Sequence, residues 1–490
     1  MSAARDLAVP AGNAPLRIFA QQWFSRVAGA PLTEGNAIEL LIDARANFDA
    51  WLAAIATAQD SVLFENYIWG DDEVSHAMVA ALASRAKDGV RVRVVRDGLG
   101  CLGVSRMKLF RPLLAAGGEV RTYNPFNPLS PLGWISRDHR KQLVVDNTVG
   151  FVSGVCVSAK WLGRVDKNIP PWRDTGLSIW GPAVQDLAMA FGETWGNLGT
   201  PLPADLKALT EPTHAAGGIA LRVVATLPHT TGIYRLDQMI AAIAEKRLWL
   251  TDAYFVGTAA YVQALSAAAK DGVDVRLLVP GTTDVPALGA LSRAGYRSLL
   301  ETGVRVFEWN GSMLHAKTAV ADGRWARVGS TNLNMASWGG NCELDVAIED
   351  EPFARRMEAQ YETDLGNATE MILEDRKTRR VRPGPVVRVG LGGRASSGSS
   401  RAAAGALRLA NTVGAAIANR RVLMSSERNV LLAGATLLAG ISVVGALWPR
   451  VIAWPFAVFA LWLGIGLVGR YVRTVRAARA AKELAPDAQG

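Results

Sequence analysis

The sequence predicts an α/β protein made of two related halves, followed by a C-terminal transmembrane helical hairpin. Three observations support this fold class. One polar motif occurs twice, the segments around it recur in the same order, and two long uncharged apolar runs lie near the C-terminus. Internal repetition indicates a duplicated structural unit, and apolar runs of about 20 residues are long enough to cross a bilayer.

The repeated motif has the pattern H-x-K-x-x-x-x-D and occupies residues 139–146 and 315–322. The chain has only five histidines, and two of them occupy matched places. Residues two apart on a strand share a face, so each imidazole and ammonium group should point into one cleft. Two full copies make a chance match a poor explanation. The candidate catalytic residues are His139, Lys141, Asp146, His315, Lys317 and Asp322.

The segments that flank the two motifs also correspond. Residues 65–68 match 252–255, each after an apolar strand and before a helical stretch. Residues 87–93 match 270–276, where a helix stops at glycine and an alternating strand begins. The order strand, helix, strand, helix, strand, motif strand is therefore expected in both halves.

On these motifs the sequence resembles the phospholipase D superfamily, over roughly residues 36 to 375. The resemblance implies two pseudo-twofold-related halves, each a mixed β-sheet flanked by helices, that share one active site. We place the halves at 36–205 and 215–375, after an N-terminal extension over 1–35.

The chemistry of these side chains agrees with the resemblance. One imidazole can act as nucleophile and the other can protonate a leaving alkoxide, while two lysines can hold phosphoryl oxygens as charge spreads over them. Such a site needs no metal and no cofactor, and the usual zinc patterns are missing from the sequence. By resemblance to two-motif members, His139 is the nucleophile and His315 the general acid.

A carboxylate lies downstream of each motif, Asp174 in the first half and Glu343 in the second. We expect each carboxylate to accept the second ring N–H of the histidine in the motif before it, which would fix the tautomer of that histidine. Asp146 and Asp322 instead end their strands before turn residues, so we interpret them as mainly structural, bonding turn backbone.

A turn of small residues follows each motif and supplies supporting candidates, Ser153 in the first half and Ser330 in the second. The family pattern has Asn after this turn, and the second copy has Asn332, but the first has Cys156. An amide can donate to a phosphoryl group, whereas a thiol is a weak donor. The two sides of the site are therefore expected to differ.

The last part of the chain has a different composition. Residues 376–490 carry 18 Lys plus Arg against 3 Asp plus Glu, so the overall net charge of +9 belongs to this tail and residues 1–375 are net acidic. We interpret 376–428 as a basic flexible linker or interfacial segment, 429–469 as two transmembrane helices and 470–490 as a basic cytoplasmic tail.

Arginines flank both ends of the apolar hairpin, which by the positive-inside rule places both ends in the cytoplasm. Three widely spaced cysteines suit a reducing compartment, and no signal peptide is found. We therefore expect a multi-pass protein of the bacterial inner membrane with a cytoplasmic catalytic domain. Its partners would be anionic membrane lipid and a phospholipid substrate, and no nucleic acid.

Within the superfamily, the chain most resembles bacterial cardiolipin synthases, on the segments 65–67, 172–174, 253–255 and 279–284. This resemblance implies transfer of a phosphatidyl group between two phosphatidylglycerol molecules through a phosphohistidine, with release of glycerol. A hydrolytic phospholipase D would use the same residues. A nucleic-acid phosphodiesterase should carry positive charge on its catalytic domain, and a non-enzymatic scaffold should have lost catalytic residues.

Overall fold

A computed structural model of the 490-residue chain describes residues 22–102, 108–125, 136–211, 213–374 and 377–380, together with parts of 436–472. Its contacts divide the chain into two compact units. One comprises Met1–Tyr123 and Asp138–Ser397, and the other Asn124–Arg137 and Gly398–Gly490. The first of these units holds both motifs, and the fold described below is that of this unit.

The first half is a mixed sheet with helices on its faces. Its strands are β1 (Thr33–Ile42), β2 (Ser61–Asn66), β3 (Arg91–Asp97), β4 (Glu119–Tyr123), β5 (Lys141–Val145), β6 (Val149–Ser153) and β7 (Thr175–Trp180). They lie in the order β1-β7-β6-β5-β2-β3-β4. β2, β3 and β4 pair in parallel, and the others pair antiparallel. The helices are α2 (Asp43–Thr57), α3 (Glu73–Lys87), α4 (Arg111–Ala115), α5 (Ala183–Asn197) and the short η3 (Ala159–Leu162) and η4 (Val165–Lys167).

The second half repeats this order strand for strand. Its strands are β8 (Ile219–Thr226), β9 (Arg247–Thr251), β10 (Asp274–Pro280), β11 (Arg305–Trp309), β12 (Thr318–Ala321), β13 (Trp325–Gly329) and β14 (Glu343–Ile348), in the order β8-β14-β13-β12-β9-β10-β11. The helices are α7 (Gly232–Ile243), α8 (Ala259–Lys270), α9 (Pro286–Leu300), α10 (Met335–Gly339) and α11 (Glu351–Leu365), and α6 (Lys207–Thr210) lies between the halves. The predicted two-half α/β architecture is confirmed.

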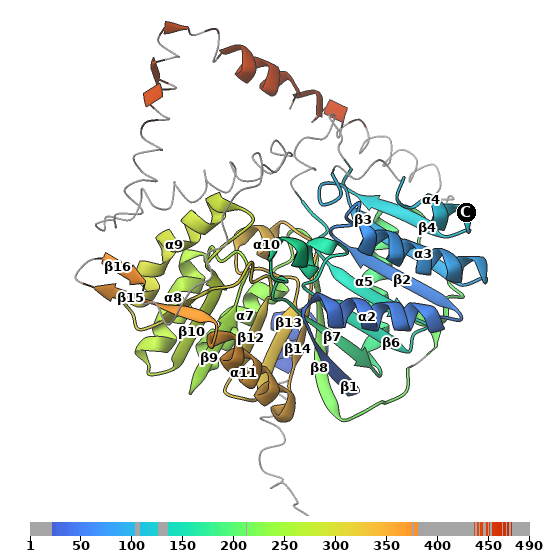
Figure 1. Ribbon diagram of the computed structural model, residues 1–490, viewed down its shortest axis with the longest axis horizontal. Coiled ribbons are helices and arrows are strands. Elements are labelled where there is room, and N and C mark those ends of the chain that lie inside the picture. Colours follow the sequence, from blue (N-terminus) through green and yellow to red (C-terminus); the bar gives the residue numbers. More distant parts are fainter. Residues whose placement is uncertain are drawn as a thin grey trace, which may run out of the picture. The chain divides into compact units, whose positions relative to one another are not determined.

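The two sheets join through the strand that opens each half. β1 pairs antiparallel with β8, with Thr33 opposite Leu221 and Asn36 opposite Ile219. Figure 1 shows β7, β1 and β8 side by side at this junction. The halves are thus related by an approximate twofold axis, and β15 (Ala368–Glu374) and β16 (Lys377–Arg380) extend the far edge of the second sheet.

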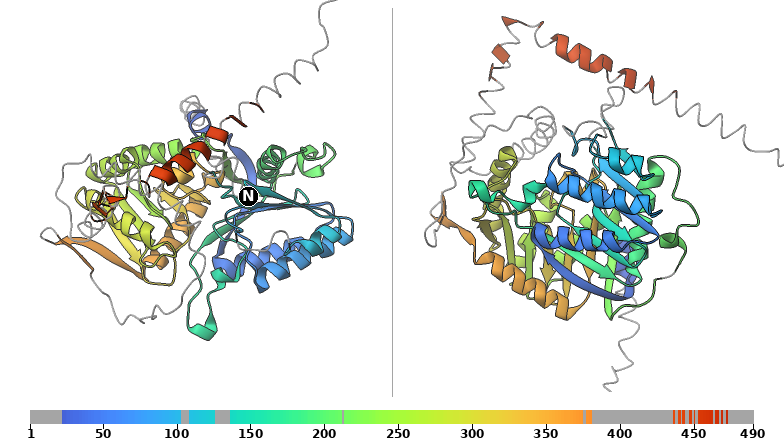
Figure 2. Two further views of the ribbon diagram at one scale, coloured as in Figure 1. Left: turned by 90° about the horizontal axis from the view of Figure 1, so that it is seen from above. Right: turned by 45° about the vertical axis from the view of Figure 1, so that its right-hand side comes forward.

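Helices cover both faces of each sheet. α2 and α3 pack with Phe64 and Val92 in one core, and α7 and α8 pack with Leu250 and Val275 in another. α5 and α11 share a third core that runs beneath both sheets. In Figure 2 the blue helices α2 and α3 lie on one face of the first sheet and the green α5 on the other. This layering buries the motif strands on both faces.

The ends of the chain differ in part from the sequence predictions. Residues 22–28, in the predicted N-terminal extension, are helical, and residues 377–380, predicted to open the linker, form β16. The rest of the linker, most of the basic tail and part of the predicted hairpin lie outside the described residues. Within the part of the chain that the structure describes, no helix combines the length and the apolar character needed to cross a membrane.

Candidate active site

His139 lies at the boundary between the halves, two residues before β5 begins. Its backbone N–H donates to the carbonyl of Cys342 in the other half, at 2.9 Å. Its Nδ1 lies 2.9 Å from Oε2 of Glu343. The same Oε2 accepts the hydroxyl of Ser330 at 2.6 Å, and Oε1 accepts Nδ2 of Asn341 at 3.2 Å. Because Glu343 is itself fully buried and held by these donors, it fixes the His139 ring.

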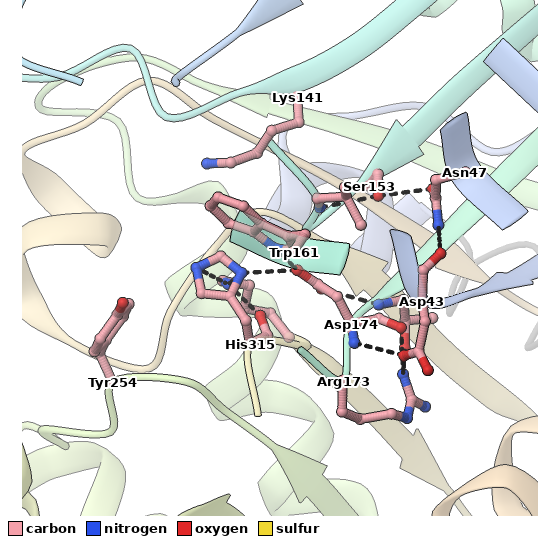
Figure 3. Close-up of polar contacts among 12 residues, drawn as sticks. Asp43, Asn47, Lys141, Ser153, Trp161, Arg173, Asp174, Tyr254 and His315 are labelled. Atoms are coloured by element: carbon pink, nitrogen blue, oxygen red, sulfur yellow. Dashed lines mark hydrogen bonds and ion pairs between the residues drawn. The ribbon is translucent and has the colours of Figure 1, made fainter. Parts of the chain in front are cut away.

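His315 repeats the arrangement with a different set of partners. Its backbone N–H donates to the carbonyl of Arg173 at 2.7 Å, and its Nδ1 lies 2.8 Å from Oδ2 of Asp174. The indole N–H of Trp161 donates to the same oxygen at 2.9 Å, and the N–H of Thr175 donates to the other at 2.9 Å. Figure 3 shows Asp174 between the His315 ring and Arg173.

The two histidine–carboxylate pairs cross between the halves. His139 of the first half pairs with Glu343 of the second, and His315 of the second pairs with Asp174 of the first. The sequence identifies these four side chains, but it suggests that each carboxylate serves the histidine upstream of it. The crossing follows from the fold, because the residues before β7 and β14 run beside the opposite motif at the twofold axis. Neither half therefore contains a complete site.

Both motif lysines lie beside the histidines. Lys141 Nζ donates to the carbonyl of His139 at 2.5 Å and lies 5.0 Å from the ring centre of Tyr67. Lys317 Nζ donates to the carbonyl of His315 and lies 2.8 Å from the Nδ1 of that ring. The positive charge of each lysine also lowers the pKa of the histidine in the other half.

Burial governs the protonation of these groups. It lowers the pKa of His139 and of His315 to about 4, although Glu343 and Asp174 act in the opposite direction. Burial also lowers the pKa of Lys317 to about 8. For Asp174 burial alone would raise the pKa, but His315 and Lys317 outweigh it and hold the pKa at about 2. At neutral pH both imidazoles are therefore uncharged, and each contacts an ionised carboxylate. An uncharged imidazole can act as a nucleophile.

Asp146 and Asp322, grouped with the catalytic candidates, contact neither histidine and need to be reassigned. Asp146 accepts backbone N–H groups of residues 59–61 at 2.7 to 2.8 Å. Asp322 accepts those of residues 245–247 at 2.8 to 2.9 Å. Each carboxylate thus ties the end of the motif hairpin to the start of a neighbouring strand. These contacts are structural, and they reach the end of the loop before β2 or β9 and the first residue of that strand rather than their own turn.

The two supporting serines have different roles. Ser330 binds Glu343, as described above, and accepts the N–H of Leu344 at 2.9 Å. Ser153 donates to Oδ1 of Asn47 at 2.9 Å and so supports the first half, whereas Ser330 binds one of the two histidine-binding carboxylates. The counterpart of Ser330 in the first half is Gly154, where an added Cβ would lie 2.1 Å from Asp174 Oδ1. In the first half the indole N–H of Trp161 donates to Asp174, as the hydroxyl of Ser330 donates to Glu343 in the second half.

Asn332 and Cys156 occupy equivalent positions after the small-residue turns, and both are buried. The Oδ1 of Asn332 has no hydrogen-bond partner among the described residues. Burial raises the pKa of the Cys156 thiol, so the sulfur is uncharged at neutral pH. The structure therefore places a strong polar group on the second-half side and a weak one on the first-half side.

Several residues at the site have no equivalent in the motif pattern. Tyr67 stands edge-on to His139 at 4.9 Å between ring centres, and Tyr254 does so to His315 at 5.9 Å. Buried Arg140 donates to the carbonyl of Glu343 at 3.2 Å, and buried Arg173 donates to that of Asp174. Tyr67, Tyr254 and Arg173 lie in segments that carry the family resemblance, but the sequence does not assign them a place in the site. In the described chain no cluster of three or more His, Cys, Asp or Glu could hold a metal ion.

Comparison with known proteins identifies the family. Residues 51–166 and 237–365 match the family described as "Cardiolipin synthase, PLD-like domain". The chain is 31% identical over 341 residues to a cardiolipin synthase of Listeria innocua, covering 69% of this chain and 70% of that protein. It is 32% identical over 358 residues to one of Clostridium perfringens, covering 71% and 74%. The crystal structure of phosphatidylserine synthase from Haemophilus influenzae shares the fold, with a TM-score of 0.56 at 13% identity over 71% of this chain and 91% of that one. The chain belongs to the cardiolipin synthase family of phospholipase D-like proteins.

Proposed function

We propose that this protein is a cardiolipin synthase, which transfers a phosphatidyl group from one phosphatidylglycerol molecule to another and releases glycerol. The observation that carries the proposal is the crossed pair of contacts that join His139 to Glu343 and His315 to Asp174. Two oriented imidazoles beside two buried lysines form a site for displacement at a phosphodiester. Similarity to named cardiolipin synthases supports the choice of lipid substrate.

In the first step His139 attacks the phosphorus of the donor. The bond between phosphorus and the glycerol oxygen breaks, its electron pair stays on that oxygen, and His315 supplies a proton. The anionic phosphodiester between the rings favours the protonated form of His315, which burial otherwise disfavours. Glycerol leaves and a phosphatidyl group remains on the His139 nitrogen.

In the second step a glycerol hydroxyl of another phosphatidylglycerol takes the place of the first. Neutral His315 accepts its proton, the oxygen attacks phosphorus, and the phosphorus–nitrogen bond breaks to regenerate His139. Lys141, Lys317 and the amide of Asn332 stabilise the phosphoryl oxygens in both steps. The thiol of Cys156 contributes little on its side.

The proposed domain boundaries are those that the sequence predicts. Residues 36–205 and 215–375 are assigned to the two halves and 429–469 to a transmembrane hairpin in the bacterial inner membrane. Residues 453–462 are helical, and their side chains include Trp454 and Phe456, which are 67% and 71% exposed. Large exposed apolar groups of this kind favour a lipid environment. A reporter fused to the C-terminus tests the assignment, and activity of a reporter that works only outside the cytoplasm would contradict it.

Two other activities would use a similar site. Hydrolysis of phospholipid to phosphatidic acid replaces the second alcohol with water and needs no change of residue. A nucleic-acid phosphodiesterase is disfavoured because residues 1–375 are net acidic.

The proposal is tested with purified full-length protein in phosphatidylglycerol vesicles. We expect cardiolipin and free glycerol in equal amounts by mass spectrometry. Phosphatidic acid without cardiolipin would make the protein a hydrolase, and cleavage of DNA or RNA alone would support the phosphodiesterase.

A further inference from the structure

We propose that Asp284, Tyr254 and Lys160 form a subsite for the glycerol headgroup beside His315, and that this subsite selects the alcohol used in transfer. The inference rests on the proposed function and deepens it, because it names the residues that recognise the acceptor. It concerns side chains outside the repeated motif, contributed by both halves of the chain.

The three side chains form one connected polar cluster. The hydroxyl of Tyr254 donates to Oδ1 of Asp284 at 2.6 Å. Nζ of Lys160 lies 2.9 Å from Oδ2 of the same carboxylate. The Lys160 ammonium also lies 4.4 Å from the ring centre of Trp172. Lys160 and Asp284 remain 42% and 23% exposed as side chains, so a ligand can reach them.

The cluster is adjacent to the reacting histidine. The Tyr254 ring stands edge-on to the His315 ring at 5.9 Å between centres, and the Trp172 ring lies 5.7 Å from it. Figure 3 shows Tyr254 and Asp174 on opposite sides of the His315 ring. Asp174 therefore holds one side of the imidazole, and the subsite borders the other.

The first half offers a different environment around His139. Asp284 follows β10 by four residues, and the residue that follows β3 by four is Cys101. Lys160 is 21 residues beyond His139, and the residue 21 beyond His315 is Ala336. The tyrosines are common to both halves, whereas the carboxylate and the ammonium are found only beside His315 among these equivalent positions. Among these equivalent positions, the additional charged groups therefore lie beside His315 and not beside His139.

The geometry of displacement explains why this side should bind the glycerol. Attack and departure at phosphorus occur roughly in line, so the leaving oxygen lies opposite His139 and next to His315. The entering hydroxyl occupies the same place in the second step. The leaving oxygen and the entering hydroxyl both belong to a glycerol headgroup. The other hydroxyls of that headgroup need hydrogen-bond partners in a site that is partly shielded from water.

The charges of the cluster match such a ligand. Burial alone would raise the pKa of Asp284, but Lys160 and Tyr254 outweigh it and hold that pKa below its ordinary value. The ionised carboxylate accepts hydroxyl groups, and the Tyr254 oxygen has a free lone pair to accept another. In phosphatidylglycerol as acceptor, an anionic phosphate lies one glycerol unit from the attacking hydroxyl. Half-exposed Lys160 can bind that phosphate as a point charge.

The test is a competition between alcohols, run with full-length protein in phosphatidylglycerol vesicles. Deuterated glycerol and 1-propanol are supplied together, and mass spectrometry measures deuterated phosphatidylglycerol against phosphatidylpropanol. We expect the intact protein to prefer glycerol. Asp284→Asn and Tyr254→Phe should each lower this preference by about tenfold, since each removes a hydrogen bond to a hydroxyl.

A second ratio tests Lys160. Lys160→Gln should lower cardiolipin relative to deuterated phosphatidylglycerol by about fivefold, because only the lipid acceptor carries a phosphate. It should leave the preference for glycerol over propanol within about twofold. Asp166→Asn is the matched control. Asp166 lies in η4, six residues beyond Lys160, and its loss breaks only an exposed ion pair with Arg164 at 3.0 Å, so both ratios should stay unchanged.

The outcomes separate this inference from the proposed function. Unchanged ratios in both Asp284→Asn and Tyr254→Phe, with transfer intact, would overturn the subsite alone. Transfer to no alcohol by the intact protein would overturn the proposed function and the subsite together. If Asp284→Asn fails to fold, the conservative Tyr254→Phe decides the hydroxyl subsite by the same ratio.

Discussion

Glu343 in the second half binds His139 in the first, with Oε2 2.9 Å from Nδ1, across the boundary between the repeated units. Asp174 and His315 form the reciprocal contact at 2.8 Å. Each half therefore supplies one motif histidine and the carboxylate that binds the histidine of the other half. A site of this kind depends on the pairing of β1 with β8 that joins the two sheets.

The first prediction concerns these crossed carboxylates. Glu343→Gln should lower kcat by about a thousandfold with little change in KM, because the amide no longer fixes the tautomer or stabilises the charged ring. Steady-state kinetics of cardiolipin formation measures both constants. Glu193→Gln is the control, since Glu193 pairs with Arg140 at 3.4 Å and contacts neither histidine. A kcat for Glu343→Gln within twofold of the control would contradict the orienting role.

The second prediction separates nucleophile from acid. A phosphatidyl ester of p-nitrophenol has a leaving group that needs no proton. His315→Ala should therefore still release p-nitrophenol, while its reaction with phosphatidylglycerol falls by about a thousandfold. His139→Ala should lose both reactions. Absorbance measures the release, and the opposite pattern in the two variants would reverse the assignment of roles.

The third prediction is a pH limit set by Lys317. Burial lowers its pKa from 10.5 to about 8, so its charge is lost as the pH rises through that value. If the charged ammonium holds the phosphoryl group, kcat/KM should fall about tenfold per pH unit above pH 8. In Lys317→Arg this decline should disappear, because a guanidinium stays charged. A decline at the same pH in both proteins would assign it to another group.

The fourth prediction follows from the two buried neutral histidines. Their pKa values fall from 6.5 to about 4 on folding, so between these values the unfolded chain binds more protons than the folded one. The free energy of unfolding should therefore be independent of these groups above pH 6.5 and decrease as the pH falls toward 4. The slope from two groups is at most about 2.7 kcal/mol per pH unit. Urea titrations at several pH values should give a smaller slope for the His139→Gln, His315→Gln double variant.

The fifth prediction tests the structural role of Asp146. Asp146→Ala leaves three backbone N–H groups of residues 59–61 without their acceptor. The midpoint of urea unfolding should drop, with a loss of about 1–3 kcal/mol. Activity per folded molecule should stay within about twofold of the intact protein, because the carboxylate does not reach the histidines. A selective loss of kcat with unchanged stability would return Asp146 to the catalytic group.

Much of the fold could be predicted because the sequence repeats itself. The matched flanking segments give the same order of strands and helices twice, and the structure has that order. The strand boundaries were less accurate, since β5 begins at Lys141 and β12 at Thr318, so each histidine precedes its strand. Motif spacing does not show that the backbone N–H of each histidine donates to a carbonyl of the other half, that of Cys342 for His139 and that of Arg173 for His315.

The sequence names the histidines and carboxylates that the structure brings together, but it does not predict which carboxylate binds which histidine. Asp174 and Glu343 were found by their place after each motif, yet their exchange between halves depends on contacts across the twofold axis. Trp161 was missed because an indole that donates to a buried carboxylate has no sequence pattern of its own. Asp146 and Asp322 show the converse, because a repeated motif residue can serve the fold rather than the chemistry.

The central claim is most directly tested by lipid mass spectrometry of a bacterial host that lacks its own cardiolipin synthases. Cells that make the intact protein should contain cardiolipin, and cells that make equal amounts of the His315→Ala variant should not. Cardiolipin in both strains would contradict the assigned site. Phosphatidic acid in place of cardiolipin, dependent on His315, would contradict the synthase and leave a hydrolase.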